Sequence, residues 1–143
     1  NGYGCIMAVR AAPVVDHDLR FDPVLPLYGW LEDVDFSRRL APFGAIVRAE
    51  ALRGVHLGTK SGRVNGLRLG YSQVSNPIYL AGKGSMRVSR AGWILLRNVA
   101  KNLLRAPWPE REVDRRGRLK GNLRALVDLF RGTLRPERAA ELE

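Results

Sequence analysis

Hydrophobic residues recur with a helical period in the second part of the chain. Residues 91–105 and 118–131 each place leucines and valines on one arc of a helical wheel, with Lys and Arg on the opposite arc. A further helix is predicted around residues 67–79, and the pair Asn76–Pro77 is expected to bend or end it. This part of the chain is therefore predicted to be helical.

The first part shows shorter apolar runs that favour strands. Residues 5–9, 45–50 and 55–57 are predicted as strands, and residues 11–29, which contain three prolines, as mostly loop. Residues 30–41 have a helical period between these strands. The pattern predicts an α/β arrangement here.

The predicted helix over residues 30–41 carries an unusual group of carboxylates in the stretch YGWLEDVDFSRRL. On a helical wheel, Glu32, Asp35 and Arg39 share the polar side, whereas Asp33 falls between two apolar arcs. A carboxylate that faces inward is costly to bury unless a partner or a reaction uses it, so Asp33 is a candidate site residue. The alternative is that Asp33 stabilises the first turn through the helix dipole.

Charge divides the chain into two predicted parts. Residues 1–58 carry 6 Lys and Arg against 7 Asp and Glu, a net charge of −1, whereas residues 59–143 carry 18 Lys and Arg against 7 Asp and Glu, a net charge of +11.

The chain begins with Asn1 and soon enters an apolar run, so we expect a piece of a longer protein. A single cysteine suits a reducing compartment, and no apolar run approaches the ~20 residues of a membrane span. We therefore expect a cytoplasmic protein that is soluble or bound at the inner face of the membrane.

Three motifs occur in a recognisable order: a glycine loop at Gly2 and Gly4, the sequence Leu31-Glu32-Asp33, and His56. Over residues 2–58 this order resembles the acceptor-side half of a family-2 glycosyltransferase with the GT-A fold. The resemblance implies the C-terminal half of a Rossmann-like GT-A catalytic domain over residues 1–58. A basic extension of amphipathic helices would follow over residues 59–143.

The resemblance also implies an inverting transfer of a sugar from a nucleotide-sugar donor to a hydroxyl of a saccharide or lipid-linked acceptor. Asp33 would be the general base, and Glu32 would contact the acceptor or start the helix. His56 would bind a divalent metal, Mg²⁺ or Mn²⁺, together with an Asp-x-Asp motif that this chain lacks at the expected place. The alternative for His56 is an ordinary core or surface imidazole.

The cleft implied by the resemblance would be lined by Gly2, Gly4 and Trp30. Lys60 and Arg63 lie in the glycine-rich stretch GTKSGRVNG, which could fold over the diphosphate as a basic lid. The alternative for this stretch is an ordinary solvated loop.

The basic helices suggest three further possibilities. A basic amphipathic helix that carries Trp93 can lie on an anionic membrane surface, or it can pack its apolar face on the core or on a partner. A strongly basic chain can also bind nucleic acid, but the basic residues are dispersed and no helix-turn-helix, zinc or RNA-sheet signature is present. A docking module without catalysis is the third possibility.

Overall fold

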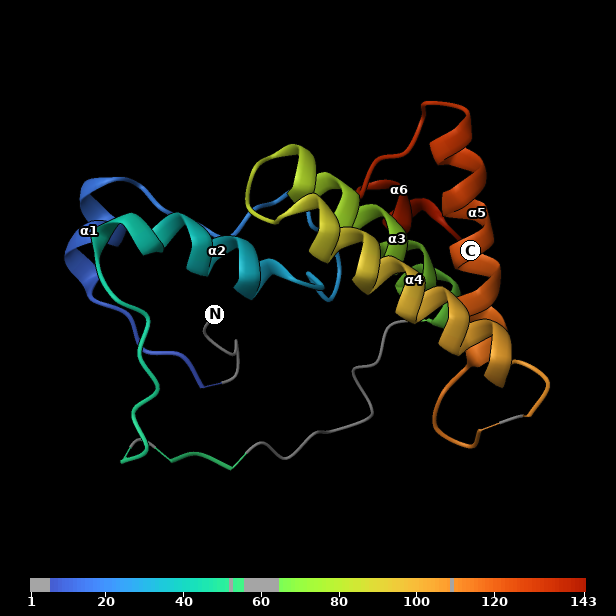
Figure 1. Ribbon diagram of the computed structural model, residues 1–143, viewed down its shortest axis with the longest axis horizontal. Helices are drawn as coiled ribbons and strands as arrows, with labels where there is room; N and C mark the ends of the chain where they lie inside the picture. The colour runs from blue at the N-terminus through green and yellow to red at the C-terminus, as the bar shows by residue number, and fades with distance from the viewer. Residues whose placement is uncertain (1–5, 52, 56–64, 109) are drawn as a thin grey trace.

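A computed structural model describes residues 6–51, 53–55, 65–108 and 110–143 (Figure 1). Helices dominate these residues. In chain order they are α1 (Ala11–Asp16), α2 (Glu32–Leu40), the short 3-10 helix η1 (Ala41–Phe43), α3 (Gly66–Gly82), α4 (Val88–Arg105), α5 (Arg115–Phe130) and α6 (Arg138–Glu141). The helices predicted over residues 30–41, 67–79, 91–105 and 118–131 are confirmed, with ends that differ by a few residues.

The predicted α/β fold is wrong for the part of the chain that the structure describes. These residues form isolated bridges but no strand or sheet, so the GT-A half-domain is not present in them. Residues 45–50 are exposed and have no neighbouring strand, and the predicted loop over residues 11–29 contains α1. A short apolar run needs a partner strand for its backbone hydrogen bonds, and the described residues provide none.

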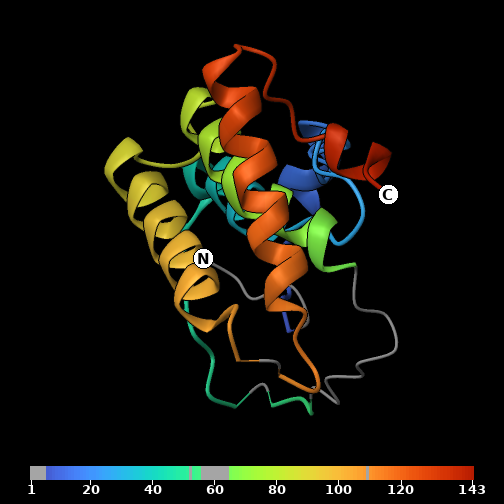
Figure 2. The ribbon, with the colours of Figure 1, turned by 90° about the vertical axis from the view of Figure 1, so that its right-hand side faces the viewer.

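Helix α3 lies at the centre of the fold and packs against α4, α5 and α6 (Figure 2). The backbones of α3 and α5 approach closely because glycine occupies the crossing. A Cβ atom at Gly70 would lie 2.1 Å from the carbonyl oxygen of Arg118, and one at Gly121 would lie 2.0 Å from that of Leu67. Pro77 does not end α3, which continues to Gly82.

Two apolar clusters form the core. The first joins the segment before α2 and α2 itself to α3 and α4, through Leu25, Val34, Leu80, Met86 and Ala91. The second joins α3 to α5 and the C-terminal residues, through Tyr71, Val74, Ala125, Ala139 and Leu142. The first cluster thus holds residues from both parts that the charge pattern separates.

Helix α4 leaves part of its apolar surface uncovered. Its most buried residues are Ala91 and Asn102, and Asn102 donates hydrogen bonds of 2.8 Å to the side chains of Gln73 and Asn122. Ile94, Leu95 and Val99 are half-buried and pack against the two core clusters, whereas Trp93, Leu96, Leu103 and Leu104 are exposed. Over the residues described, we find no helix with both the length and the apolar character needed to cross a bilayer.

Candidate functional site

The turn that leads into α2 has a strained backbone. Leu27, Gly29 and Leu31 have φ angles of 60°, 55° and 75°, in the left-handed region. Leu31 is the residue immediately before α2, and a leucine in this conformation costs on the order of 1–3 kcal/mol. At Gly29 this conformation favours glycine, and a Cβ atom there would also require the Glu32 carboxylate to move.

Helix α3 holds this turn in place through a buried amide. The Nδ2 group of Asn76 donates a 2.8 Å hydrogen bond to the carbonyl oxygen of Trp30, and Ser75 donates to Oδ1 of Asn76. Asn76 is fully buried, so its amide is fixed by these contacts rather than by water. The strained turn is therefore tied to the centre of the fold, 46 residues further along the chain.

Glu32 and Asp33 occupy the first two positions of α2, and both are half-buried. Oδ1 of Asp33 accepts a 2.8 Å hydrogen bond from the backbone N–H of Val34. Burial, and then the negative charge of Asp33, raise the pKa of Glu32. The structure thus places two neighbouring carboxylates at the end of the strained turn, where access to solvent is restricted but not closed.

The fully buried carboxylate of α2 is Asp35, which the helical wheel had placed on the polar side with Arg39. Asp35 accepts hydrogen bonds from Arg39 at 3.0 Å, from Lys83 at 2.9 Å and from the hydroxyl of Ser85. The wheel was wrong about the burial of Asp35 because the α3–α4 turn covers it, and this turn brings a cation and a hydroxyl to satisfy it.

A second carboxylate joins this arrangement from the segment before α2. Asp22 accepts hydrogen bonds from Lys83 and, at 2.9 Å, from the hydroxyl of Tyr79. Burial raises the pKa of Asp22, but the bonds from Lys83, the Val24 backbone and Tyr79 together lower it below its ordinary value. Burial and the bond to Asp22 raise the pKa of Tyr79 to about 12. Because every member is paired, we interpret this network as structural: it anchors α2 on the α3–α4 turn.

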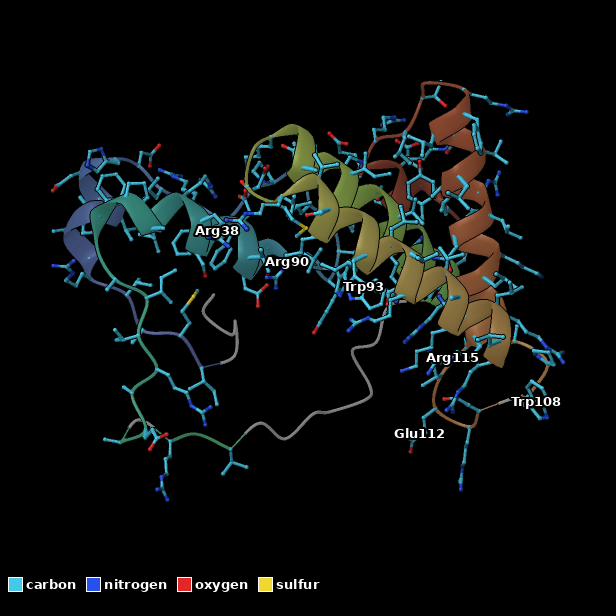
Figure 3. All side chains as sticks on the ribbon, viewed as in Figure 1. Arg38, Arg90, Trp93, Trp108, Glu112 and Arg115 are labelled. Carbon is cyan, nitrogen blue, oxygen red and sulfur yellow. The ribbon has the colours of Figure 1, made fainter. Side chains whose placement is uncertain are left out.

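Two hollows of about 500 Å³ each lie between α2 and α4. They share Arg90 and Trp93, and Figure 3 shows these side chains along α4 with Arg38 on the neighbouring α2. We call the two together the basic hollow. Its lining consists of Trp30, Leu31, Val34, Arg38, Ser85, Met86, Arg87, Ser89, Arg90, Trp93, Ile94 and Arg97.

The chemistry of the basic hollow follows from its arginines and tryptophans. Four arginines and no carboxylate are among the lining residues, so the hollow favours anionic groups, phosphate above all. Trp30 and Trp93 supply broad apolar surfaces of the kind that bury the flat faces of ligands. Leu31 and Val34, which line the hollow, flank Glu32 and Asp33 in the sequence, but neither carboxylate is among the lining residues.

The predicted site residues are distributed unevenly. Trp30 lines the hollow, whereas Glu32 and Asp33 lie at the start of α2 and are not among its lining residues. The remaining candidates, Gly2, Gly4, His56, Lys60 and Arg63, lie outside the described residues. Among the residues that are described, no group of three or more His, Cys, Asp or Glu side chains could hold a metal ion, so these residues do not provide the predicted divalent metal site.

Sequence reasoning missed the contribution of α4 to the hollow and the role of Asn76. Arg90, Trp93 and Arg97 recur on one side of the helix, and a tryptophan among arginines was the available signal. Asn76 gave no such signal, because its partner is a backbone carbonyl far away in the chain.

Comparisons of the chain with protein families, with curated proteins and with solved structures find no match.

Proposed function

We propose that this chain takes part in inverting glycosyl transfer, from a nucleotide-sugar donor to a hydroxyl of a saccharide or lipid-linked acceptor, with Asp33 as the general base. One observation carries the proposal. A strained turn, fixed by the buried amide of Asn76, leads directly into the Glu32–Asp33 pair, and the residues on either side of this pair line the basic hollow.

The strained backbone before α2 is informative because a helix can begin without such a conformation. An ordinary Ser, Asp or Asn before the first turn satisfies the free N–H groups of a helix without a left-handed leucine. At Leu31 the side chain makes no such cap, and the conformation is maintained by contacts from α3. Backbone strain of this kind concentrates at functional sites, where it fixes a group in one position. Here the group that follows is the carboxylate pair.

In the proposed reaction Asp33 accepts the proton of the acceptor hydroxyl as its oxygen attacks the anomeric carbon of the donor. A new bond forms between that oxygen and the anomeric carbon, while the bond to the nucleotide diphosphate breaks. The tryptophans of the hollow would bury a sugar face, and its arginines would bind phosphate. The described residues provide no ligand set for the divalent metal that the resemblance implies.

The replacement Asp33→Asn tests the proposal directly. The amide keeps the shape of the side chain but cannot accept the proton, so turnover should fall by about two to four orders of magnitude while the affinity for the donor stays nearly unchanged. The measurement is release of nucleoside diphosphate, with a panel of nucleotide sugars and a lipid extract as acceptor, by the protein as its natural gene encodes it.

Asp16→Asn is the matched control, because Asp16 is an exposed carboxylate on α1, outside the hollow. It should leave turnover unchanged. Circular dichroism and thermal melting of both variants check that the fold is intact. Near-normal turnover of the folded Asp33→Asn protein would remove this residue from the mechanism, and a wild-type protein that transfers no sugar from any donor would overturn the proposed function.

A further inference from the structure

Helix α4 presents a continuous apolar surface to solvent. Trp93 is 63% exposed and Leu104 is 70% exposed, and Leu96 and Leu103 lie between them on the same side of the helix. We call these four residues the outer face of α4. Large apolar side chains gain roughly 25 cal/mol for each Å² removed from water, so a surface of this kind is stabilised when something covers it.

The residues that the structure describes leave this surface exposed. The opposite side of α4 is held on α3 and α5 by Ala91 and by the buried amide of Asn102. Because Asn102 is 1% exposed and bonded to partners on two helices, the helix cannot turn its leucines inward without leaving those amides unsatisfied. The orientation of α4 is therefore fixed, with its outer face directed away from the core.

The charges of α4 indicate what covers the outer face. The helix contains Arg90, Arg97, Lys101 and Arg105 and no acidic residue. A second copy of this chain would bring two such cationic helices together, which is unfavourable. An anionic surface would instead attract these charges, of which Arg105 is also paired with Glu110, while the exposed leucines and Trp93 enter an apolar layer.

We propose that α4 lies flat on an anionic lipid bilayer, with its outer face in the boundary between headgroups and acyl chains. Trp93 belongs to the outer face and also lines the basic hollow, and Arg90 and Arg97 line the hollow as well. Docking therefore brings the mouth of the hollow to the level of the lipid headgroups. The inference rests on the packing of α4 and stands independently of the proposed chemistry at Asp33.

Co-sedimentation of the full chain with vesicles tests the inference. We expect binding to vesicles of phosphatidylcholine mixed with an equal amount of phosphatidylglycerol at low salt, and much weaker binding at high salt. Vesicles of phosphatidylcholine alone should bind poorly. Each Lys or Arg near an anionic surface contributes about 1 kcal/mol, so the double variant Arg97→Gln with Lys101→Gln should bind about 25-fold more weakly.

Matched variants test whether vesicle binding depends on the outer face of α4 or on the charge and hydrophobicity of the chain in general. Leu104→Asp should abolish most of the binding, whereas Val15→Asp, at a valine on α1 that is 74% exposed, should not. Arg48→Gln with Arg53→Gln removes two exposed cations far from α4 in the sequence and should have a smaller effect than the α4 pair. Because all these positions are exposed, the melting temperatures should stay close to that of the wild type.

Four outcomes would overturn the inference. They are equal binding to neutral and anionic vesicles, equal binding by Leu104→Asp and wild type, self-association in the absence of lipid that Leu104→Asp abolishes, and salt-sensitive binding of RNA or DNA without binding of vesicles. Asp33→Asn should bind vesicles as the wild type does. A failure of the proposed reaction therefore remains distinguishable from a failure of the docking surface.

Discussion

Helices α3 and α4 are neighbours of nearly equal length, 17 and 18 residues, yet they distribute polarity in opposite ways. In α3 the apolar residues Tyr71, Val74 and Leu80 are fully buried. In α4 three of the four leucines, Leu96, Leu103 and Leu104, are exposed, whereas Asn102 is buried. The comparison shows that the amphipathic pattern of a helix does not by itself determine which side packs.

The difference arises from position in the fold. Helix α3 contacts α4, α5 and α6, and the segment around α2 covers its C-terminal end, so almost every side of it is enclosed. Its polar residues, such as Gln73 and Asn76, are buried with partners. Helix α4 is enclosed on one side only. That side holds Ala91 and Asn102 together with the half-buried Ile94, Leu95 and Val99, and the other large apolar residues of the helix remain exposed.

The largest effect on stability is expected where α3 meets α5 most closely. A methyl group in Gly121→Ala would lie 2.0 Å from the carbonyl oxygen of Leu67 and 2.6 Å from the amide nitrogen of Tyr71, both backbone atoms. The helices would have to separate, at a cost of about 3 kcal/mol or more in the free energy of unfolding. Urea denaturation measures the change.

Gly92→Ala is the control on α4. A Cβ atom there meets nothing within 4 Å, so the replacement should leave stability unchanged or increase it by up to about 1 kcal/mol. Comparable destabilisation by both replacements would contradict the view that the two helices differ in how tightly they are enclosed.

A smaller loss of stability is expected when a buried polar residue of α4 is made apolar, or an exposed apolar residue is made polar. In Asn102→Leu the side chains of Gln73 and Asn122 lose their hydrogen bonds in a buried place, which should lower the free energy of unfolding by about 2 kcal/mol. Leu103→Asn makes the opposite change on the outer face and should alter stability by no more than about 0.5 kcal/mol. If Asn102→Leu were neutral, the buried amide would not fix the orientation of α4.

The existence of four helices could be predicted from periodicity, but the sides they bury could not. Asp35 appeared solvent-facing on a wheel because Lys83 and Ser85, its partners, lie 48 and 50 residues further along the chain. The same limit applies to Asn102, whose burial depends on amides of α3 and α5. A helical wheel assumes that the apolar side packs, and this assumption fails where a polar network provides the contact.

The strands were wrongly predicted for a related reason. Residues 45–50 are apolar enough for a buried strand, but the described chain offers no partner strand. The candidate site was predicted in part: Trp30 lines the basic hollow, Glu32 and Asp33 begin α2 without lining it, and the roles of the two carboxylates stay predictions. The arginines of α4 could not be assigned to it, since a site built by two helices depends on their packing.

The smallest predicted effect is on the pH dependence of stability. It should depend on the buried hydroxyl of Tyr71 in α3 and not on an exposed tyrosine hydroxyl. Burial, and then the hydrogen bond and charge of Asp128, raise the pKa of Tyr71 to about 12, above the ordinary value of 10.0. The fold thus favours the neutral phenol, and this contribution to stability is complete below pH 10 and is lost as the pH rises toward 12. At about one pH unit above the ordinary pKa, the free energy of unfolding should have fallen by about 1 kcal/mol on account of Tyr71.

Denaturant melts over this range in the wild type and in Tyr71→Phe measure that contribution. The variant is less stable at neutral pH because the 2.8 Å bond from the hydroxyl to Asp128 is lost, but its stability should decline less steeply between pH 10 and 12. Tyr28→Phe, at a tyrosine that is 67% exposed, should keep the wild-type slope. Parallel slopes for wild type and Tyr71→Phe would mean that the phenol ionises as readily in the fold as in water, and that α3 is less completely enclosed than its packing indicates.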